Sequence, residues 1–429
     1  MERKMKDSGI PWIGEIPEHW DVMRLRRVFS EAHEKTTDEE GQLLTLSQYT
    51  GISPKSEGKR VGMFEAESTV GYNIVHVGQF VMNIMLAWNG SYGVSDFEGI
   101  ISPAYVVFNF NFRCCKKYFH YLLRLDGYPP AFKTVSRGII ESRLRLYPIY
   151  FYQFLTIVPP LAEQEAIAAY LDAKCGEIDE LIEVEQQMIS DLESYRQAVI
   201  TEAVTHGLNP DVLVKETTSF WLPKIPAHWE LHYLRGISKG FRKGNGITKE
   251  DLIPDGNIAC VRYGDLYTKY NHHISDIHCR TNVSKIQNPV YAAYGDIYFT
   301  CSGEDVDAIG KSAAYLSDED CLIGGDLIIM KHSQNPKFLG YSLDSIICQK
   351  QKSYGKSKLK VVHTSVKDLK NVAVAIPPLS EQKKIAEYLD AKCSEIDKLI
   401  KVKQEKIETL KQYRQSLIFE AVTGKTTIA

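Results

Sequence analysis

The chain has 429 residues, 44% of them hydrophobic, which is enough for about two to four domains that each bury a core. Its formal net charge of −3 excludes a chain that is basic throughout, and its nine cysteines include no CxxC pair of the kind that binds zinc. No run of about 18 apolar residues is present and no apolar segment follows MERKMKDSG, so we expect a soluble, reduced, cytoplasmic protein without a membrane segment.

Residues 1–158 are predicted to form a first globular domain. It begins with an entry segment, WIGEIPEHW at residues 12–20, in which Trp20 is expected to be an anchor. Further along the chain, Asn89-Gly90-Ser91 forms a turn-like loop with hydrogen-bonding side chains. A basic stretch follows near the end of the domain, and its cations are Lys133, Arg137, Arg143 and Arg145.

Residues 159–206 are predicted to form one long helix. After Pro159-Pro160 the segment contains no proline, and its only glycine is Gly176. Apolar residues recur at alternating four- and three-residue steps, as in a coiled coil. The helix is expected to be capped at Ala162 and to extend over about 43 residues, or roughly 65 Å.

Residues 207–376 are predicted to form a second globular domain with its own entry segment, WLPKIPAHW at 221–229. Near its end lies the most basic stretch of the chain, at the position that matches the basic stretch of the first domain. Its candidate contacts are Lys350, Lys352, Tyr354, Lys356, Lys358 and Lys360. Four other residues, His272, His273, His278 and Cys279, have a spacing that fits no standard zinc site, so we assign no metal.

Residues 377–429 contain a second long helix, expected to be capped at Ser380, and here the chain repeats itself. Residues 377–423 match residues 159–205 at a constant offset of 218, without a gap, and 30 of the 47 positions are identical. A period above 200 residues indicates a duplicated domain pair rather than a solenoid. The two globular blocks between the repeats are not obviously alike in sequence.

The two helices are expected to pair with each other as an antiparallel coiled coil, because a helix of this length with one apolar stripe needs a partner. The predicted interface consists of Leu171, Ile178, Ile182, Glu185, Ile189, Leu192, Leu389, Ile396, Ile400, Lys403, Ile407 and Leu410. Two of these are polar, and we expect Glu185 and Lys403 to approach each other where the helices cross.

The charges of the two helices favour pairing within one chain. Residues 163–205 carry a net charge of −9 and residues 381–423 a net charge of +1, and five equivalent positions change from Glu to Lys. Two first helices would repel each other, whereas a first and a second helix would not. The alternative interpretation is that these charges lie on solvated faces whose composition has drifted.

The duplicated PPLxEQxxIAxYLDAK, the two IPxHW segments and the two divergent blocks resemble the specificity subunits of type I restriction-modification systems, over essentially the whole chain. Residues 79–105, 295–311 and 324–329 are similar to variants of the target recognition domains in that family. The resemblance implies an α/β (α+β) fold with two globular target recognition domains, separated by two long antiparallel helices in a pseudo-two-fold duplication.

The resemblance also implies partners: double-stranded DNA, two methyltransferase subunits and restriction subunits. Neither a P-loop nor the Asn/Asp-Pro-Pro-aromatic motif of amino-methyltransferases is present, so we expect no catalytic site and no cofactor in this chain. S-adenosylmethionine, ATP and Mg²⁺ are then implied for the partner subunits.

In this interpretation the basic stretches of both domains contact DNA phosphates, and Asn89 and Ser91 are suited to base edges. Two unlike readers held apart by the helix pair predict an asymmetric target in two parts with an unread spacer. For the basic stretches the alternative is a solvated loop, and for Asn89 and Ser91 an ordinary turn. For the whole chain, the alternative is a duplicated coiled-coil adaptor whose variable domains bind proteins.

Overall fold

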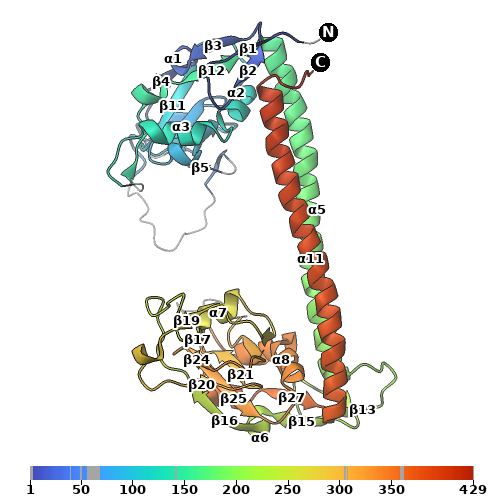
Figure 1. Cartoon of the computed structure of the whole chain (residues 1–429). Coiled ribbons are helices and arrows are strands. Elements are labelled where there is room, and N and C mark those ends of the chain that lie inside the picture. Colours follow the sequence, from blue (N-terminus) through green and yellow to red (C-terminus); the bar gives the residue numbers. More distant parts are fainter. Residues whose placement is uncertain are drawn as a thin grey trace. The chain divides into compact units, whose positions relative to one another are not determined.

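The computed structural model describes residues 3–38, 40–48, 51–55, 68–140, 143–303, 306, 308–357 and 362–428, apart from the side chain of Lys285. The chain divides into two compact units (Figure 1). Unit 1 comprises Met1–Glu185 with Glu405–Ala429, and unit 2 comprises Gln186–Gln404. Each unit therefore contains one β-rich domain, one half of the first long helix and one half of the second. The domain boundaries expected at residues 158, 206 and 376 stay predictions.

The two long helices are α5 (Leu161–His206) and α11 (Leu379–Val422), with 46 and 44 residues. They begin shortly before the predicted caps Ala162 and Ser380, so those two cap assignments were wrong. The first turn of each helix contains an acidic residue, Glu163 or Glu381, where a negative charge is favourable near the helix N-terminus.

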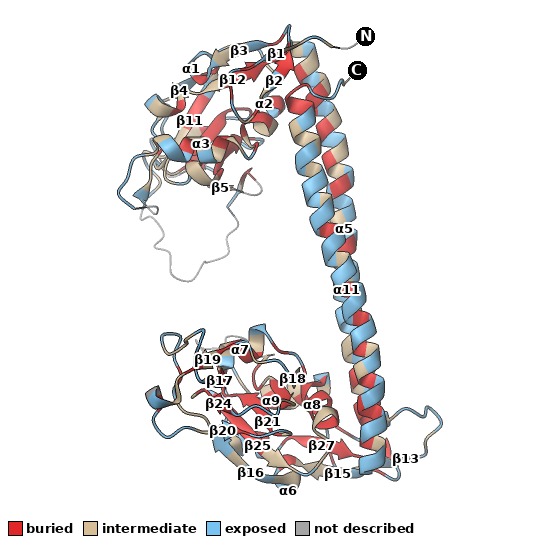
Figure 2. Ribbon diagram, viewed as in Figure 1, coloured by how far each residue is buried: buried red, intermediate tan, exposed pale blue. Residues whose placement is uncertain are grey.

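The two helices pack together in antiparallel fashion within each unit. In unit 1 Arg414 of α11 forms an ion pair with Asp179 of α5. In unit 2 Arg196 of α5 forms an ion pair with Asp397 of α11. These two pairs are equivalent under the 218-residue repeat, which gives the pairing its pseudo-two-fold symmetry. Figure 2 shows the buried residues along the faces that the two helices turn toward each other.

The domain of unit 1 is built on a four-stranded antiparallel sheet. Its order is β4 (Phe29–Ala32), β11 (Tyr105–Phe110), β8 (Phe80–Asn83) and β9 (Tyr92–Val94). The strands are rich in aromatic and β-branched residues, which fit a pleated, half-buried surface. On one face of the sheet a cluster of aromatic rings forms the core with α2 (Lys116–Leu123) and α3 (Tyr128–Val135).

The remaining elements of unit 1 are short. β3 (Asp21–Arg24) pairs with β12 (Leu155–Val158), β1 (Met5–Asp7) with β2 (Glu15–Pro17), β5 (Leu44–Ser47) with β6 (Gly51–Pro54), and β7 (Asn73–Val75) with β10 (Gly99–Ile101). Further helical turns include α1 (Leu25–Val28), η1 (Ala87–Asn89) and α4 (Pro148–Phe151).

The domain of unit 2 repeats the same antiparallel order. β16 (Ser238–Lys243) is followed by β25 (Leu327–His332), β21 (Ile297–Thr300) and β23 (Ser312–Tyr315), and β18 (His273–Ile274) adds a parallel edge strand. A second sheet has the order β19 (Arg280–Thr281), β17 (Ile258–Val261), β24 (Cys321–Ile323) and β20 (Tyr291–Ala292). In unit 1 the pairs β6–β5 and β10–β7, joined by a parallel bridge between Leu43 and Ile100, follow the corresponding order. The two blocks that look unrelated in sequence thus share a scaffold.

Several of the other elements of unit 2 correspond to elements of unit 1. The pairs are β13 (Val214–Glu216) with β14 (Lys224–Pro226), β15 (Glu230–Tyr233) with β27 (Ala373–Ile376), and β22 (Ser302–Gly303) with β26 (Val362–His363). The helices are α6 (Leu234–Ile237), α7 (Tyr263–Thr268), η3 (Val283–Lys285), α8 (Pro336–Asp344), α9 (Ile346–Ser353) and α10 (Val366–Lys370).

One backbone hydrogen bond shows how closely the two scaffolds correspond. The N–H of Leu146 donates to the carbonyl of Ile84 at 2.8 Å in unit 1, and the N–H of Thr364 donates to the carbonyl of Cys301 at 2.8 Å in unit 2. In unit 1 this bond joins the segment after α3 to the residue that follows β8. In unit 2 it joins the segment after α9 to the residue that follows β21. Within the described ranges, no helix is long and apolar enough to cross a membrane.

Candidate nucleic-acid interface

In unit 1 the structure places the predicted basic stretch beside the segment that contains the turn-like loop. The ammonium group of Lys133, on α3, lies 5.0 Å from the centre of the Trp88 ring in η1. Arg145 approaches the same segment, because its guanidinium group contacts the sulfur of Met85 at 3.8 Å. The basic stretch and the segment that leads into the turn-like loop, more than 40 residues apart in the sequence, therefore lie side by side.

The four predicted cations of unit 1 lie on or beside a closed turn. The N–H of Arg137 donates to the carbonyl of Arg145 at 2.9 Å, and the reverse bond is also 2.9 Å. The Arg137 guanidinium lies 5.0 Å from the centre of the Tyr150 ring. Lys133, Arg137 and Arg143 are exposed, and Arg145 is half-buried. We name this surface, formed by Lys133, Arg137, Arg143 and Arg145, the unit 1 basic turn.

Asn89 and Ser91 have more local roles than predicted. The Ser91 hydroxyl is buried and donates to Oδ1 of Asn89 at 3.0 Å. Between them Gly90 has a φ of 94°, a conformation that glycine adopts without a steric penalty. These contacts fit the alternative of an ordinary turn for Ser91, whereas Asn89 remains half-buried beside Trp88.

In unit 2 the predicted basic stretch does not form one exposed surface. Lys352, on α9, is 2% exposed, and its ammonium group donates to the carbonyls of Gly310 and Leu343 at 2.6 and 2.8 Å. It also reaches the hydroxyl of Ser312 at 3.3 Å. Burial lowers the pKa of Lys352. The assignment of Lys352 to phosphate binding was therefore wrong, because the protein already surrounds its charge.

The other residues of this stretch differ from one another. Lys356 forms an ion pair with Asp368 at 3.1 Å and donates to the carbonyl of His363 at 2.7 Å. Tyr354 is exposed and packs edge-on against Trp221 of the entry segment, with ring centres 5.5 Å apart. Lys350 is exposed. Lys358 and Lys360 lie outside the described residues, and their role stays a prediction.

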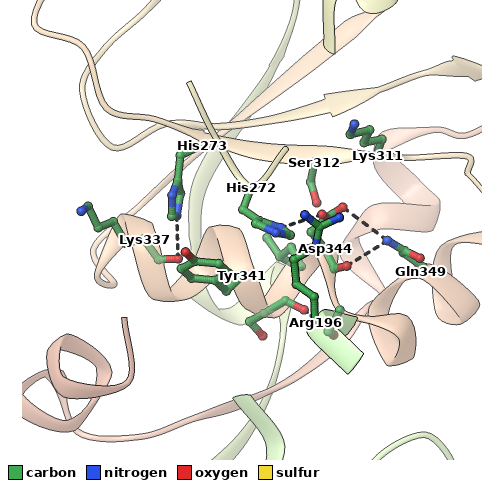
Figure 3. Close-up of polar contacts among 12 residues, drawn as sticks. Arg196, His272, His273, Lys311, Ser312, Lys337, Tyr341, Asp344 and Gln349 are labelled. Carbon is green, nitrogen blue, oxygen red and sulfur yellow. Dashed lines mark hydrogen bonds and ion pairs between the residues drawn. The ribbon is translucent and has the colours of Figure 1, made fainter. Parts of the chain in front are cut away.

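Two of the histidines that were weighed as metal ligands, His272 and His273, lie in a polar cluster of unit 2 (Figure 3), whereas His278 stacks on Tyr270. His272 forms an ion pair with Asp344 at 2.8 Å, and both side chains are buried. His273 is hydrogen-bonded to the carbonyl of Lys337 at 3.3 Å, and burial lowers its pKa to about 4. The structure thus gives both rings protein partners. Within the described residues, no group of His, Cys, Asp and Glu side chains could hold a metal ion.

A cavity of about 320 Å³ adjoins this cluster, and sequence reasoning did not anticipate it. It is lined by residues from α5 and from the unit 2 domain: Arg196, Gln197, Asn271, His272, Ala308, Lys311, Asp344 and Gln349. Burial lowers the pKa of Lys311, while Asp344 acts in the opposite direction. No periodicity could have identified this cavity, because its residues come from five separate segments.

The twelve predicted interface residues of the helices all lie on the less exposed side of α5 and α11. Seven are buried and five are half-buried. Glu185 is 3% exposed and accepts a hydrogen bond from Nζ of Lys406 at 2.6 Å. Lys403 lies 3.2 Å from the sulfur of Met188. Since Met188 is equivalent to Lys406 and Glu185 to Lys403, these two contacts are related by the repeat. The approach of Glu185 to Lys403 itself stays a prediction.

Each domain is attached to a long helix by the same contacts. In unit 1 Asp172 of α5 accepts from Lys117 at 2.7 Å and from the hydroxyl of Tyr121 at 2.9 Å. In unit 2 the equivalent Asp390 of α11 accepts from Lys337 at 2.6 Å and from Tyr341 at 2.9 Å. These attachment residues were missed, although their occurrence in both copies was a signal that could have found them.

The repeated PPLxEQ motif has a physical role in both units. Gln164 is buried, donates to the carbonyl of Pro159 at 2.7 Å and accepts from the N–H of Cys115 at 3.0 Å. Gln382 makes the corresponding bonds, to the carbonyl of Pro377 at 2.8 Å and from the N–H of Asn335 at 2.8 Å. The motif therefore connects the start of each long helix to its domain.

The helices also carry an exposed apolar face that occurs twice. Leu181 and Val184 of α5 are about half exposed, and so are their equivalents Leu399 and Val402 of α11. The ion pair Lys174–Glu177 within α5 and the equivalent ion pair Lys392–Glu395 within α11 lie two turns before these apolar residues. A buried seam must be retained for folding, but an exposed face has no such constraint. The same apolar pair is exposed on both helices.

Comparison with known proteins gives a consistent result. Residues 226–412 match the family model described as type I restriction modification DNA specificity domain. The chain is 23% identical, over 97% of its length and 96% of the relative, to a Methanocaldococcus jannaschii protein assigned as the specificity subunit of the type I restriction enzyme MjaX. It is 24% identical to the type I restriction enzyme EcoBI specificity subunit of Escherichia coli, over 73% of this chain and 66% of that protein.

A solved structure supports the fold. One chain of a structure described as concerning complex assembly and conformational transition of the type I R-M system superimposes with a TM-score of 0.67. It is 17% identical, and the match covers 96% of this chain and 99% of that chain. At this identity the likeness concerns the fold, namely two β-rich domains with two long helices packed together.

Proposed function

We propose that this chain, which belongs to the specificity subunits of type I restriction-modification systems, reads an asymmetric DNA target in two parts, one with each unit. As such a subunit it is non-catalytic and supplies DNA specificity. The observation that supports two reading sites is the sheet order shared by the two domains, although only residues 226–412 match the family model. Unlike surfaces on one scaffold would recognise unlike half-sites.

In unit 1 the basic turn is the proposed contact with DNA. Three of its four cations are exposed, and the turn is fixed at its base by paired backbone bonds. Arginine suits both phosphate oxygens and the edge of guanine. In unit 2 the exposed Lys350 and Tyr354, together with Lys358 and Lys360, remain the proposed contacts. Lys352 is withdrawn from this group because it is buried, and no other residue takes its place.

We further propose that two copies of one methyltransferase subunit bind the exposed apolar faces around Leu181 and Leu399. Because the two faces are equivalent under the repeat, they would bind the same partner twice. S-adenosylmethionine would then be held by that partner, and ATP and Mg²⁺ by restriction subunits that join the complex. The assembly would act on DNA in the cytoplasm.

Methylation mapping of a host that expresses this chain with its methyltransferase would test the function. We expect one split motif with unlike halves, which disappears when the gene for this chain is deleted. The double variant Arg137→Glu/Arg143→Glu should weaken binding and reduce the slope of log affinity against log salt by about two. Arg113→Glu is the matched control, since Arg113 is exposed in the same domain outside the basic turn.

Two results would contradict the proposal. If random duplex competes as well as the mapped target, the variable domains do not read DNA, and the adaptor alternative gains support. If the mapped motif is continuous, or if both halves change together when only the unit 1 basic turn is altered, the assignment of one half-site to each unit is wrong.

A further inference from the structure

We propose that the cavity between α5 and the unit 2 domain binds a phosphate group, held by Arg196 of α5 and Lys311 of the domain. The cavity has a volume of about 320 Å³, which lies within the range of small-molecule sites. All of the residues that line it are described and belong to unit 2 (Figure 3). The site does not require the chain to read DNA, because a free phosphate compound and a phosphate of the DNA backbone present the same kind of oxygen atoms.

Comparison of the two units explains why there is space at this place. In unit 1 Arg124 follows Tyr121 by three residues, is half-buried and donates to two backbone carbonyls of its own domain. The equivalent residue of unit 2 is Asp344, three residues after Tyr341, and its shorter side chain pairs with His272. The exchange of a long side chain for a short one accounts for part of the cavity.

The cavity wall carries two cations whose donors the protein does not fully use. Lys311 is half-buried, and the only hydrogen bond of its ammonium group to a described residue is a long one, 3.4 Å to the carbonyl of Tyr267. Arg196 is paired with Asp397 through one nitrogen, but its Nε is buried and has no hydrogen-bond partner among the described residues. Buried cations with unused donors are costly, and a bound anion would remove that cost.

A neutral side chain of the cavity also suits an oxyanion. Oε1 of Gln197, the residue after Arg196, is buried and without a partner in the described part of the chain. The Gln197 amide can rotate to present its oxygen or its nitrogen, so it can accept from a protonated phosphate or donate to an ionised one. The Gln349 amide donates to the carbonyl of Asp344 at 2.9 Å and so fixes the end of α8.

These features select a phosphate group rather than a cation. The cavity is lined by two cations and one carboxylate, and that carboxylate, Asp344, is already paired with His272. Guanidinium and ammonium groups are common phosphate ligands in proteins. Because Arg196 lies on α5 and Lys311 directly precedes β23, a phosphate bound to both would connect the long helix to its domain.

Calorimetric titration of the full chain with inorganic phosphate, at constant ionic strength, tests the site itself. We expect one phosphate to bind per chain. Lys311→Ser introduces the residue that unit 1 has at the equivalent place, since Ser91 directly precedes β9 as Lys311 precedes β23. It should weaken binding about tenfold or more, the effect of one lost charge-assisted hydrogen bond.

Two further variants separate the cavity from its charge. Ala308→Leu fills part of the cavity without changing any charge, and it should weaken phosphate binding as Lys311→Ser does. Lys239→Ser is the matched control, because Lys239 is an exposed lysine of β16 that does not line the cavity. It should keep the full affinity for phosphate.

A second measurement distinguishes the two sources of phosphate. The complex of this chain with its methyltransferase is titrated with the duplex found by methylation mapping. If the ligand is a phosphate of the DNA backbone, Lys311→Ser and Ala308→Leu weaken duplex binding and inorganic phosphate competes with the duplex at constant ionic strength. If the ligand is a free phosphate compound, these variants bind the duplex as Lys239→Ser does and only the phosphate titration changes.

The inference is overturned if neither inorganic phosphate nor the duplex distinguishes Lys311→Ser from Lys239→Ser. It is also overturned if Lys311→Ser weakens binding while Ala308→Leu keeps the full affinity, since the phosphate would then contact the lysine outside the cavity. Equal binding of random and mapped duplex would contradict the proposed function instead, and the phosphate titration would still decide whether the site exists.

Discussion

Lys350 and Lys352 show how two neighbouring residues of the same type can differ in role. Both belong to one basic stretch, and α9 turns them to different sides. Lys350 is exposed, whereas Lys352 is enclosed and bonds to three oxygen atoms of the protein. A buried lysine with saturated donors connects segments of the domain, and a solvated lysine is available to a ligand.

Lys352→Met should therefore destabilise unit 2. The change removes the donor and leaves the carbonyls of Gly310 and Leu343 without their partner, at a cost of about 2–4 kcal/mol in the free energy of unfolding. Lys350→Met, the matched control on the same helix, should change stability by less than about 0.5 kcal/mol. Urea denaturation followed by tryptophan fluorescence checks both values. Equal stability of the two variants would mean that Lys352 is not enclosed.

Two histidines should make the domains less stable in mild acid. Burial lowers the pKa of His120 in unit 1, and of His273 in unit 2, from 6.5 to about 4. Between these values the unfolded chain binds a proton that the folded chain does not, so stability falls as the pH falls through this window. By pH 5 the loss should be up to about 2 kcal/mol per histidine.

Melting temperatures measured from pH 7 to pH 5 test this expectation. The double variant His120→Asn/His273→Gln replaces both titrating rings by amides placed to keep a hydrogen bond. Its stability should depend less on pH over this range, whatever its absolute value. An unchanged pH dependence in the variant would assign the effect to other groups.

At the scale of elements, the long helices combine an apolar seam with a few polar residues inside it. Glu185 is the clearest of these, since it is buried and bonded to Lys406 across the seam. A buried ion pair adds little to stability by itself, but removing one partner is costly because the other charge remains desolvated. Such a position opposes a shift in register of the two helices, because the carboxylate must stay beside its cation.

Glu185→Lys should destabilise the helix pair by about 3–5 kcal/mol, because it places two cations together where one carboxylate lay. Adding Lys406→Glu restores an opposite charge and should recover most of the loss. Thermal denaturation followed by the helical circular dichroism signal gives both changes, and the double-mutant cycle isolates the coupling. A cycle without coupling would show that the two residues do not interact.

At the scale of the whole molecule, duplication explains which surfaces recur. The attachment residues Asp172 and Asp390, the motif residues Gln164 and Gln382, and the exposed apolar faces are each present twice. In contrast, the described residues of the basic stretch in unit 2 differ from the unit 1 basic turn, since Lys352 is buried and Lys356 is ion-paired. Attachment is therefore shared between the two units, whereas the proposed reading surfaces differ.

This organisation predicts the stoichiometry of the complex. Leu181→Glu/Val184→Glu should reduce the number of bound methyltransferase subunits from two to one, because it places charge on one apolar face and leaves the equivalent face intact. Leu399→Glu/Val402→Glu should have the same effect, and all four changes together should abolish binding. Native mass spectrometry counts the subunits. The proposed partner surface is wrong if the quadruple variant still binds two.

Several features could be predicted from the sequence because they depend on local spacing. The helices α5 and α11 follow from apolar periodicity without proline, and their kinship follows from a gapless repeat. The absence of familiar catalytic motifs and the family resemblance were also readable from residue order. Neither the cap positions nor the role of Gln164 followed, since those depend on what the domain places beside the helix start.

The tertiary structure decided the rest, because burial and proximity depend on which segments fold against each other. It showed that two blocks unlike in sequence share one strand order, since hydrogen bonding of the backbone is insensitive to side-chain identity. It enclosed Lys352 and exposed Ile139, a distinction that charge and hydropathy along the chain do not contain. The sequence by itself determined the duplicated helical frame, and the fold determined which side chains remain available to bind DNA.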